Sequence, residues 1–130
     1  MSHTALQADS LRPTVTATDL EKSIAFYTEG LGFEVTHRGE IEGALRYVEM
    51  KAGNVGFVLG RDDFKKGRDR VKGVGLRFHI DTSEDIKELA DRAIKAGITL
   101  DEGPAPLPWG PMAFAVTDPD GFHLTIANPR

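Results

Sequence analysis

The chain has 130 residues, the length of a single domain, and its 40% hydrophobic and 28% charged residues are typical of a globular protein rather than a disordered one. Sixteen basic residues stand against 20 acidic ones, and the net charge of −4 argues against a nucleic-acid partner. The chain contains no cysteine, which excludes disulfides, thiolate metal ligands and cysteine nucleophiles.

The first ten residues, MSHTALQADS, lack the basic and then apolar pattern of a signal peptide. No apolar run approaches the ~20 residues that a membrane-spanning helix needs. We therefore expect a cytoplasmic, soluble protein with no membrane partner.

The first half of the chain predicts a strand, a helix and three more strands. Apolar and polar residues alternate over 12–18, the period of a strand with one buried face. Thr18-Asp19-Leu20-Glu21 has the spacing of a capping box, and apolar residues then recur at helical steps. Gly30 and Gly32 suit the left-handed positions that close a helix. Three alternating runs predict further strands, at 33–35, 47–50 and 55–59.

The same order returns sixty-two residues later, measured from Asp19 to Asp81. Alternation over 75–80 predicts a strand, and Thr82 or Ser83 is the candidate cap of a helix that Gly97 ends. The remaining predicted elements are a strand that starts at Ile98 and Leu100, a proline-rich loop over 103–108, and strands over 112–116 and 122–127 joined by the Asp118-Pro119-Asp120-Gly121 turn.

These elements predict one domain over residues 1–130, built from module one (about 11–60), a linker (61–72) and module two (about 73–129). Nine of the twelve linker residues are charged and six of these are basic. Such a segment is either an anion-binding patch or a solvated connection, and the three interleaved acids favour the solvated connection.

The string TATDLEKSIAFYTEGLGFEV, the repeated strand-helix-three-strand order and WGPMAFAVTDPDGFHLTIANP resemble the glyoxalase, bleomycin-resistance and extradiol-dioxygenase superfamily, also called the vicinal oxygen chelate superfamily. The resemblance extends from Arg12 to Pro129. It implies an α+β fold of two tandem βαβββ modules, each a curled half-barrel sheet with its helix outside. It also implies a homodimer whose modules enclose two concave sites. Lyases, isomerases, epimerases, dioxygenases and drug-binding proteins share this fold, so the fold does not determine the activity.

Metal-dependent members of that superfamily bind a divalent ion through four His, Gln or Glu side chains on the concave strands of both modules. The matching positions here are Arg12, Val58, Gly75 and Thr125, and none is a good metal ligand. We therefore expect no metal cofactor. A displaced metal near His79 and His123 is the alternative, although no third ligand is apparent. His3, in the tail, and His37, at a loop or strand end, are interpreted as surface residues.

Strand parity predicts which polar residues face the concave side and can contact a small-molecule ligand. They are Arg12, Thr14, Thr16, Arg77, His79, His123 and Thr125. Arginine can hold a carboxylate, phosphate or phenolate, and threonine can bind carbonyl and hydroxyl groups. Threonine is also common in strands, and Arg77 could instead pair with an acid across a dimer interface.

Trp109, the only tryptophan, lies in the loop Leu107-Pro108-Trp109-Gly110. Its indole can stack on a planar ligand at the rim of a pocket, or it can cover the core beside Pro108 and Pro111. Phe26 and Tyr27, although part of the resemblance, are expected to pack rather than to bind.

The leading hypothesis is a metal-free, homodimeric protein that sequesters an aromatic or polar natural product, as in bleomycin resistance. The alternative is an enzyme on the same fold: a glyoxalase-like lyase, isomerase or dioxygenase with displaced metal ligands, or one with His79 or His123 as a general base. A third hypothesis is that the protein is a structural or interaction module. The sequence shows no group that would orient such a base.

Overall fold

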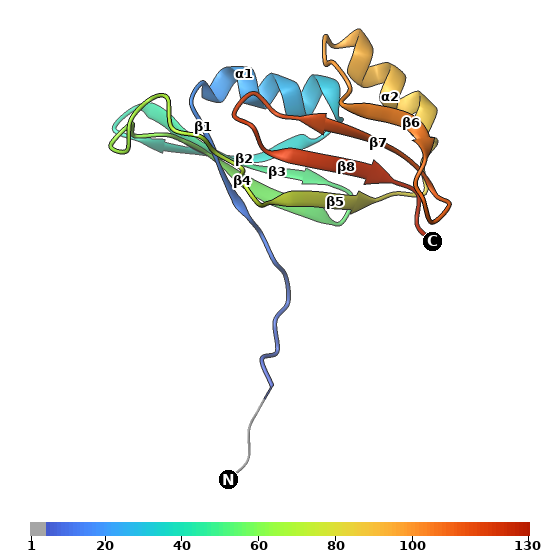
Figure 1. Cartoon of the computed structure of the whole chain (residues 1–130). Helices are drawn as coiled ribbons and strands as arrows, with labels where there is room; N and C mark the ends of the chain where they lie inside the picture. Colours follow the sequence, from blue (N-terminus) through green and yellow to red (C-terminus); the bar gives the residue numbers. More distant parts are fainter. Residues whose placement is uncertain (1–4) are drawn as a thin grey trace.

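The computed structural model describes residues 5–130 and contains the predicted βαβββ order twice (Figure 1). Module one consists of β1 (Thr14–Ala17), α1 (Leu20–Ala25), the π-helical turn η1 (Phe26–Gly30), β2 (Glu34–Ile41), β3 (Ala44–Ala52) and β4 (Val55–Arg61). Module two consists of β5 (Arg77–Asp81), α2 (Ile86–Lys95), β6 (Glu102–Pro106), β7 (Met112–Thr117) and β8 (His123–Ala127). The predicted fold class, α+β with two tandem modules, is confirmed.

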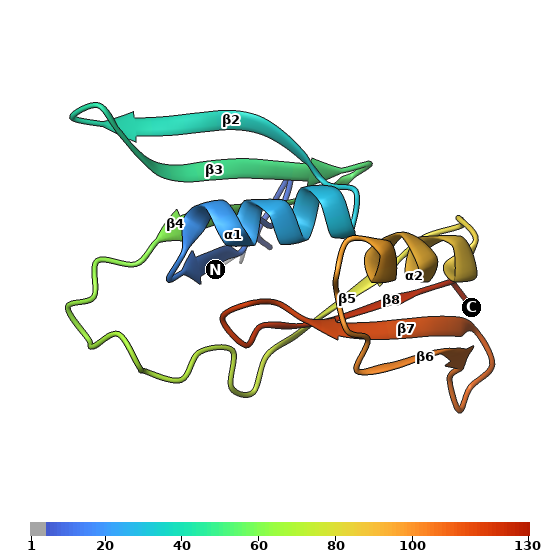
Figure 2. The ribbon, with the colours of Figure 1, turned by 90° about the horizontal axis from the view of Figure 1, so that it is seen from above.

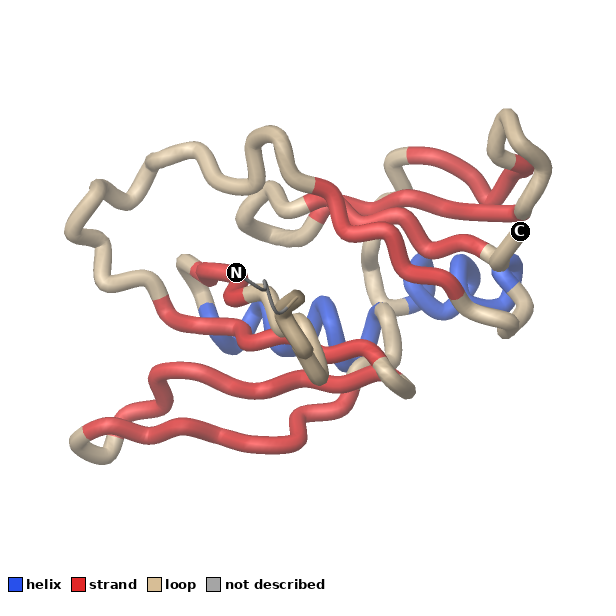
Figure 3. Tube along the Cα trace, turned by 90° about the horizontal axis from the view of Figure 1, so that it is seen from below, coloured by secondary structure: helices blue, strands red, loops and turns tan. Residues whose placement is uncertain are grey.

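Each module forms its own four-stranded sheet with the same topology. The strand order is β1-β4-β3-β2 in the first sheet and β5-β8-β7-β6 in the second. β1 pairs with β4, and β5 with β8, in parallel, whereas the other neighbours are antiparallel. Both helices cover the same side of the two sheets (Figures 1 and 2), which leaves the opposite side open (Figure 3). Within residues 5–130, β1 and β5 are both edge strands.

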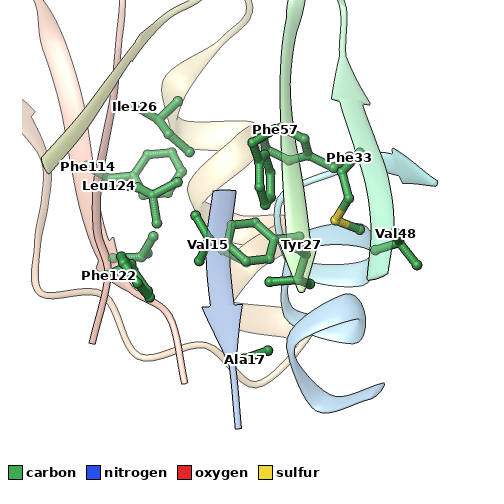
Figure 4. Packing of buried hydrophobic residues seen from close by; sticks show 14 of the residues in the cluster. Val15, Ala17, Tyr27, Phe33, Val48, Phe57, Phe114, Phe122, Leu124 and Ile126 are labelled. Carbon is green, nitrogen blue, oxygen red and sulfur yellow. The ribbon is translucent and has the colours of Figure 1, made fainter. Parts of the chain in front are cut away.

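The helix-facing side chains of both sheets form one core (Figure 4). Tyr27 packs on Phe57 with ring centroids 4.7 Å apart, and Phe33 packs on Phe57 at 5.3 Å. Module two adds Phe114 and Leu124, which are almost completely buried. Because alternation placed these residues on one side of each strand, the polar residues between them lie on the open side.

The helix ends differ from the sequence prediction in two places. Asp19, rather than Thr18, caps α1, and its side chain accepts a hydrogen bond from Lys22 N at 3.1 Å. Asp85, rather than Thr82 or Ser83, caps α2, because a turn over 82–84 carries the chain past the end of β5 before the helix begins. Gly32 (φ +83°) and Gly97 (φ +93°) take the predicted left-handed conformation.

Gly30 does not have a positive φ, so its predicted role in closing the helix is wrong. Glycine is instead required here because the side chain of Ile98 occupies the space that a Cβ would fill.

The region after α2 was predicted incorrectly. The segment at Ile98 and Leu100 is not a strand, and most of the predicted proline-rich loop is strand β6. β6 is an edge strand with an irregular register between Glu102 and Ala105, and edge strands tolerate proline because one side of the strand needs no hydrogen bonds.

The segment between β4 and β5 is joined to both modules by three charged side chains and one hydroxyl, here called the clamp: Asp62, Lys72, Asp120 and Thr18. Lys72 Nζ donates to Thr18 Oγ1 at 2.8 Å and lies 3.3 Å from carboxylate oxygens of both Asp62 and Asp120. The Asp120 carboxylate also accepts from the Thr18 backbone and hydroxyl. Burial acts to raise the pKa of Asp62, but hydrogen bonds from Phe64 N, Lys72 and Arg70 outweigh it and lower the pKa.

The Asp118–Gly121 turn binds the first module through a second buried carboxylate. Tyr27 Oη donates to Asp118 Oδ2 at 2.7 Å, while Asp118 Oδ1 accepts from Asp120 N and Phe122 N. Burial raises the pKa of Asp118 despite these hydrogen bonds. Burial, together with the charge of Asp118, raises the pKa of the Tyr27 phenol. The turn therefore also connects module two to the helix of module one.

In the part of the chain that the structure describes, no helix is long and apolar enough to cross a bilayer.

Candidate functional site

Four of the predicted site residues meet on the open face of module two. Arg77 pairs in register with His123, and His79 pairs with Thr125, on the adjacent parallel strands β5 and β8. Their side chains lie opposite the core residues Phe78 and Leu124 in the alternation of these strands. Arg77 Nη1 donates to Thr125 Oγ1 at 3.0 Å, which holds the guanidinium along β8.

A floor of small side chains adjoins these polar groups. Ala115 pairs with Thr125, and Ala113 pairs with Ala127, across β7 and β8. All four are at most 9% exposed, although they lie on the face away from the helices. Alanine keeps these side chains short, and their low exposure means that they offer little accessible surface of their own. The alternation of alanine with Phe114 and Val116 in MAFAVT is the sequence signal for this floor, which our sequence analysis missed.

A cavity of about 450 Å³ runs along the free edge of β5, between the two modules. Arg77, Phe78 and His79 line one side of this seam cavity, and residues 54–57 of module one and 9–11 of the N-terminal segment line the other. Its volume lies in the range of small-molecule sites. The cavity and the alanine floor therefore flank the same arginine.

The sequence did not reveal the hydrogen-bond partners of His123. His123 Nδ1 lies 2.9 Å from Thr117 Oγ1, and the Thr117 hydroxyl donates to Asp101 Oδ2 at 2.6 Å. Thr117 comes from β7, and Asp101 precedes β6. His79 has a simpler environment, with its Nε2 3.2 Å from Asp81 Oδ1 and both side chains substantially exposed.

Arg12, Thr14 and Thr16 lie on the open face of module one, apart from the module two residues. Arg12 forms an ion pair with Glu49 of β3, a residue that the sequence analysis did not single out. Thr14 is in register with Val58 of β4, which is in register with Glu49 in turn. The parity of the predicted strand over 47–50 would have placed Glu49 on this face.

Trp109 lies at the far end of module two. The loop that contains it joins β6 to β7 next to the Ala113 and Ala127 pair, whereas Arg77 and His123 are four strand positions away. That separation corresponds to roughly 13 Å along a strand. Trp109 is 54% exposed. Because of its distance from Arg77, it can contact the same ligand only if that ligand extends along the alanine floor.

The side chains at the four positions where the superfamily binds a metal do not fit a divalent ion. Arg12 carries a fixed positive charge, Val58 has no donor atom, and the Thr125 hydroxyl is hydrogen-bonded to Arg77. Gly75 has no side chain and lies before β5 rather than in it. Among residues 5–130, no three His, Cys, Asp or Glu side chains form a group that could hold a metal.

The two remaining histidines lie away from these positions. His37 lies on β2 with its ring centroid 5.9 Å from that of Tyr47. His3 is outside the described residues.

The structure repeats one βαβββ module, with both helices on one side and the opposite face of the sheets open. The chain belongs to the Glyoxalase/Bleomycin resistance protein/Dioxygenase superfamily, whose model matches residues 2–126, and the resemblance noted in the sequence is thereby confirmed. No curated protein matches the chain.

Three solved structures illustrate the similarity of the fold. A member of the same superfamily from Sphaerobacter thermophilus DSM 20745 is 25% identical, with a TM-score of 0.71 over 95% of this chain and 100% of that one. TnmS3, an antibiotic binding protein from Streptomyces sp. CB03234, is 22% identical, with a TM-score of 0.72 over 97% and 100%. TioX from Micromonospora sp. ML1 is 19% identical, with a TM-score of 0.72 over 92% and 98%.

Proposed function

We propose that the protein binds a planar, anionic small molecule on the open face of module two without a metal, and that it sequesters an aromatic natural product. The observation that carries this proposal is Arg77. It is exposed, it is held by Thr125, and among the described residues it has no acidic partner. An exposed guanidinium beside an apolar floor is suited to a carboxylate or phenolate on an aromatic ring.

The surroundings of Arg77 support the same class of ligand. The seam cavity offers about 450 Å³ along β5 beside Arg77, and the adjoining floor is apolar. The side chains at the superfamily's metal positions support binding without a metal. The similarity to an antibiotic binding protein agrees with a binding role.

Calorimetric titration with 2-naphthoate tests the proposal, with the uncharged analogue 2-naphthylmethanol as the ligand control. Arg77→Gln should weaken 2-naphthoate binding about 10- to 100-fold, because a hydrogen bond to a charged group contributes about 1.5–3 kcal/mol. Arg46→Gln, a change at an exposed arginine on β3, is the matched control and should bind like the wild type.

Equal affinity of Arg77→Gln and wild type would overturn the assignment of Arg77, as would equal affinity for the two naphthalenes. Unchanged binding after dialysis against EDTA is expected, and loss of binding would contradict a metal-free site.

We further propose that the protein works as a homodimer. Edge strands β1 and β5 present backbone groups with no strand partner within residues 5–130, and Leu76, just before β5, is 46% exposed. Such edges favour pairing with another chain. Sedimentation should show a dimer that Leu76→Lys shifts toward monomer, and a wild-type monomer at every attainable concentration would refute the proposal.

A further inference from the structure

A seam between the two modules runs along the whole free edge of β5. The seam cavity of about 450 Å³ adjoins a second cavity of about 530 Å³, which lies between the end of β5, α2 and the turn that joins β3 to β4. The residues that line both cavities are Phe33, Asn54, Val55 and Ile80. Figure 4 shows core side chains of module one, such as Phe57, and of module two, such as Ile126, on opposite sides of the seam. Its walls are therefore largely apolar.

The backbone of β5 directs hydrogen-bonding groups into this seam. Thr82 N donates to Ala127 O of β8 at 2.8 Å. Backbone directions alternate along a strand, so Phe78 and Ile80 also direct their N–H and C=O groups toward β8. The N–H and C=O of His79, which lies between them, point the other way. Because β5 ends its sheet, no strand within residues 5–130 pairs with these groups, and such an edge can accept an added extended chain.

The opposite wall of the seam is also the edge of a strand. β1 begins at Thr14, which is in register with Val58, so residues 55–57 of β4 extend past its start. Val58 N donates to Pro13 O at 2.8 Å, and Gly56, two positions earlier, directs its backbone groups the same way. An extended chain in the seam would therefore lie between two strand edges.

The two ends of the seam carry opposite charges. Arg77 lines the cavity at the start of β5, and Asp9, the one acid that lines that cavity in the described chain, makes no ion pair with it. Asp81 and Glu84 line the cavity at the other end, where Arg92 donates to two carbonyl oxygens of η1. Four strand steps place Arg77 and Asp81 roughly 13 Å apart. A ligand of that length is favoured if it is an anion at one end and a cation at the other.

We propose that the seam binds a linear peptide of about five residues, added antiparallel to β5 as an extra strand. This binding mode rests on the proposed function, because Arg77 holds the terminal carboxylate of the peptide as it would hold that of an aromatic acid. The amino terminus lies near Asp81, and the central residue exchanges two backbone hydrogen bonds with His79. The second and fourth side chains lie on the same side as Ile80 and Phe78, in the apolar part of the seam.

Calorimetric titration with the unblocked peptide Ser-Leu-Ser-Leu-Phe tests the register of the added strand. The control peptide Leu-Ser-Leu-Ser-Phe has the same composition and the same charged ends, but it places serine rather than leucine in the apolar part of the seam. The control should bind at least about 10-fold more weakly, because its leucine side chains lose their apolar contacts. Equal affinities of the two peptides would overturn the proposed strand addition.

Changes to the backbone of either partner test the hydrogen bonds directly. N-methylation of the central serine removes the donor opposite His79 and should weaken binding about 10-fold. His79→Pro removes the N–H that points into the seam, and it should weaken the peptide similarly while amide NMR spectra show intact pairing of β5 with β8, because a strand edge tolerates proline. His79→Ala keeps the N–H and should retain most of the affinity. Unchanged binding to His79→Pro would refute the added strand.

Changes at the peptide ends test its direction. Amidation of the carboxyl terminus should weaken binding about 10- to 100-fold in the wild type and much less in Arg77→Gln. Acetylation of the amino terminus should weaken binding about threefold in the wild type and less in Glu84→Gln, because that end is exposed to solvent. The reverse pairing of ends and variants would overturn the antiparallel direction.

The outcomes separate this inference from the proposed function. If 2-naphthoate binds through Arg77 but the peptide does not bind, the seam site is refuted and the proposed function stands. If neither binds, the proposed function fails as well. If dodecanoate binds the seam as tightly as the peptide, the backbone groups contribute nothing and strand addition is refuted.

Sedimentation distinguishes the peptide from a second copy of the chain. Leu76, the dimer contact proposed above, lines neither cavity, so the peptide should leave a dimer intact. Dissociation of the dimer on addition of the peptide would show that a second copy occupies the seam, and it would overturn the assignment of the seam to a peptide.

Discussion

The two modules share one topology but present different chemistry on their open faces. In module one, Arg12 forms an ion pair with Glu49. The residue in register with Glu49 on β4 is the apolar Val58. In module two, Arg77 has a threonine partner and, among the residues described, no acid. The same strands thus support an ion pair in one half and, among the described residues, an arginine without an acidic partner in the other. The difference depends on single side chains at equivalent faces, not on the fold.

Loss of the clamp should have the largest effect on stability, because the clamp links the two modules through buried charges. Lys72→Met leaves the buried Asp120 carboxylate without its cation and should lower the free energy of unfolding by about 3 kcal/mol. Urea denaturation measures the change. Lys66→Met, at an exposed lysine of the same segment, should differ from wild type by less than about 0.5 kcal/mol. Equal stability of the two variants would show that Lys72 is not a structural link.

A larger side chain on the alanine floor should have the next largest effect, a weaker affinity of module two for 2-naphthoate. Ala115→Leu places a branched side chain beside Thr125 on the open face and should weaken 2-naphthoate binding about 10-fold or more, on the scale of an overpacked site. Calorimetry measures the affinity, and Ala44→Leu on the exposed start of β3 serves as the control. An unchanged affinity would mean that the ligand does not lie on the floor.

The acid dependence of stability should be smaller in a variant that lacks Asp62. The pKa of Asp62 is lowered in the folded protein, so its contribution to stability is present above its ordinary pKa and is lost as the pH falls below about 4. Asp62→Asn should therefore be less stable than wild type at pH 7 and lose less on acidification. Urea midpoints at pH 7 and pH 3 test this. A parallel loss in both proteins would assign the acid sensitivity to other groups.

Releasing Arg12 from its partner is the subtlest change and would make module one resemble module two. Glu49→Gln leaves Arg12 without a negative charge and should create a second, weaker site for 2-naphthoate, visible as a rise in stoichiometry. The double variant Glu49→Gln/Arg12→Gln should return to the wild-type stoichiometry. If Glu49→Gln alone gains no site, the difference between the modules is not one of charge.

Most of the fold was predictable because it depends on local patterns. Alternation placed Val15 and Leu124 toward the core, and helical spacing identified both helices. The errors fell where tertiary contacts override local preference. β6 contains prolines but pairs with β7 at a sheet edge, and Asp85 caps α2 only because of the turn that precedes it.

The candidate site was predicted less completely. Parity placed Arg77, His79, His123 and Thr125 on one face, which needs only the period of a strand. It could not show that Glu49 neutralises Arg12 from 37 residues away, or that Asp101 reaches His123 through Thr117. Such pairings depend on which strands become neighbours and in what register.

The repeated module, the core-facing positions and the residue types on the open faces can all be read from the sequence, because each follows from periodicity within a few residues. Which charges meet depends on the packing of the completed fold. It buried Lys72 between two carboxylates in a segment that reads as a solvated connection, and it left Arg77 beside an oriented histidine. A charge is neutralised or left available only by what the completed fold places within a few ångströms of it.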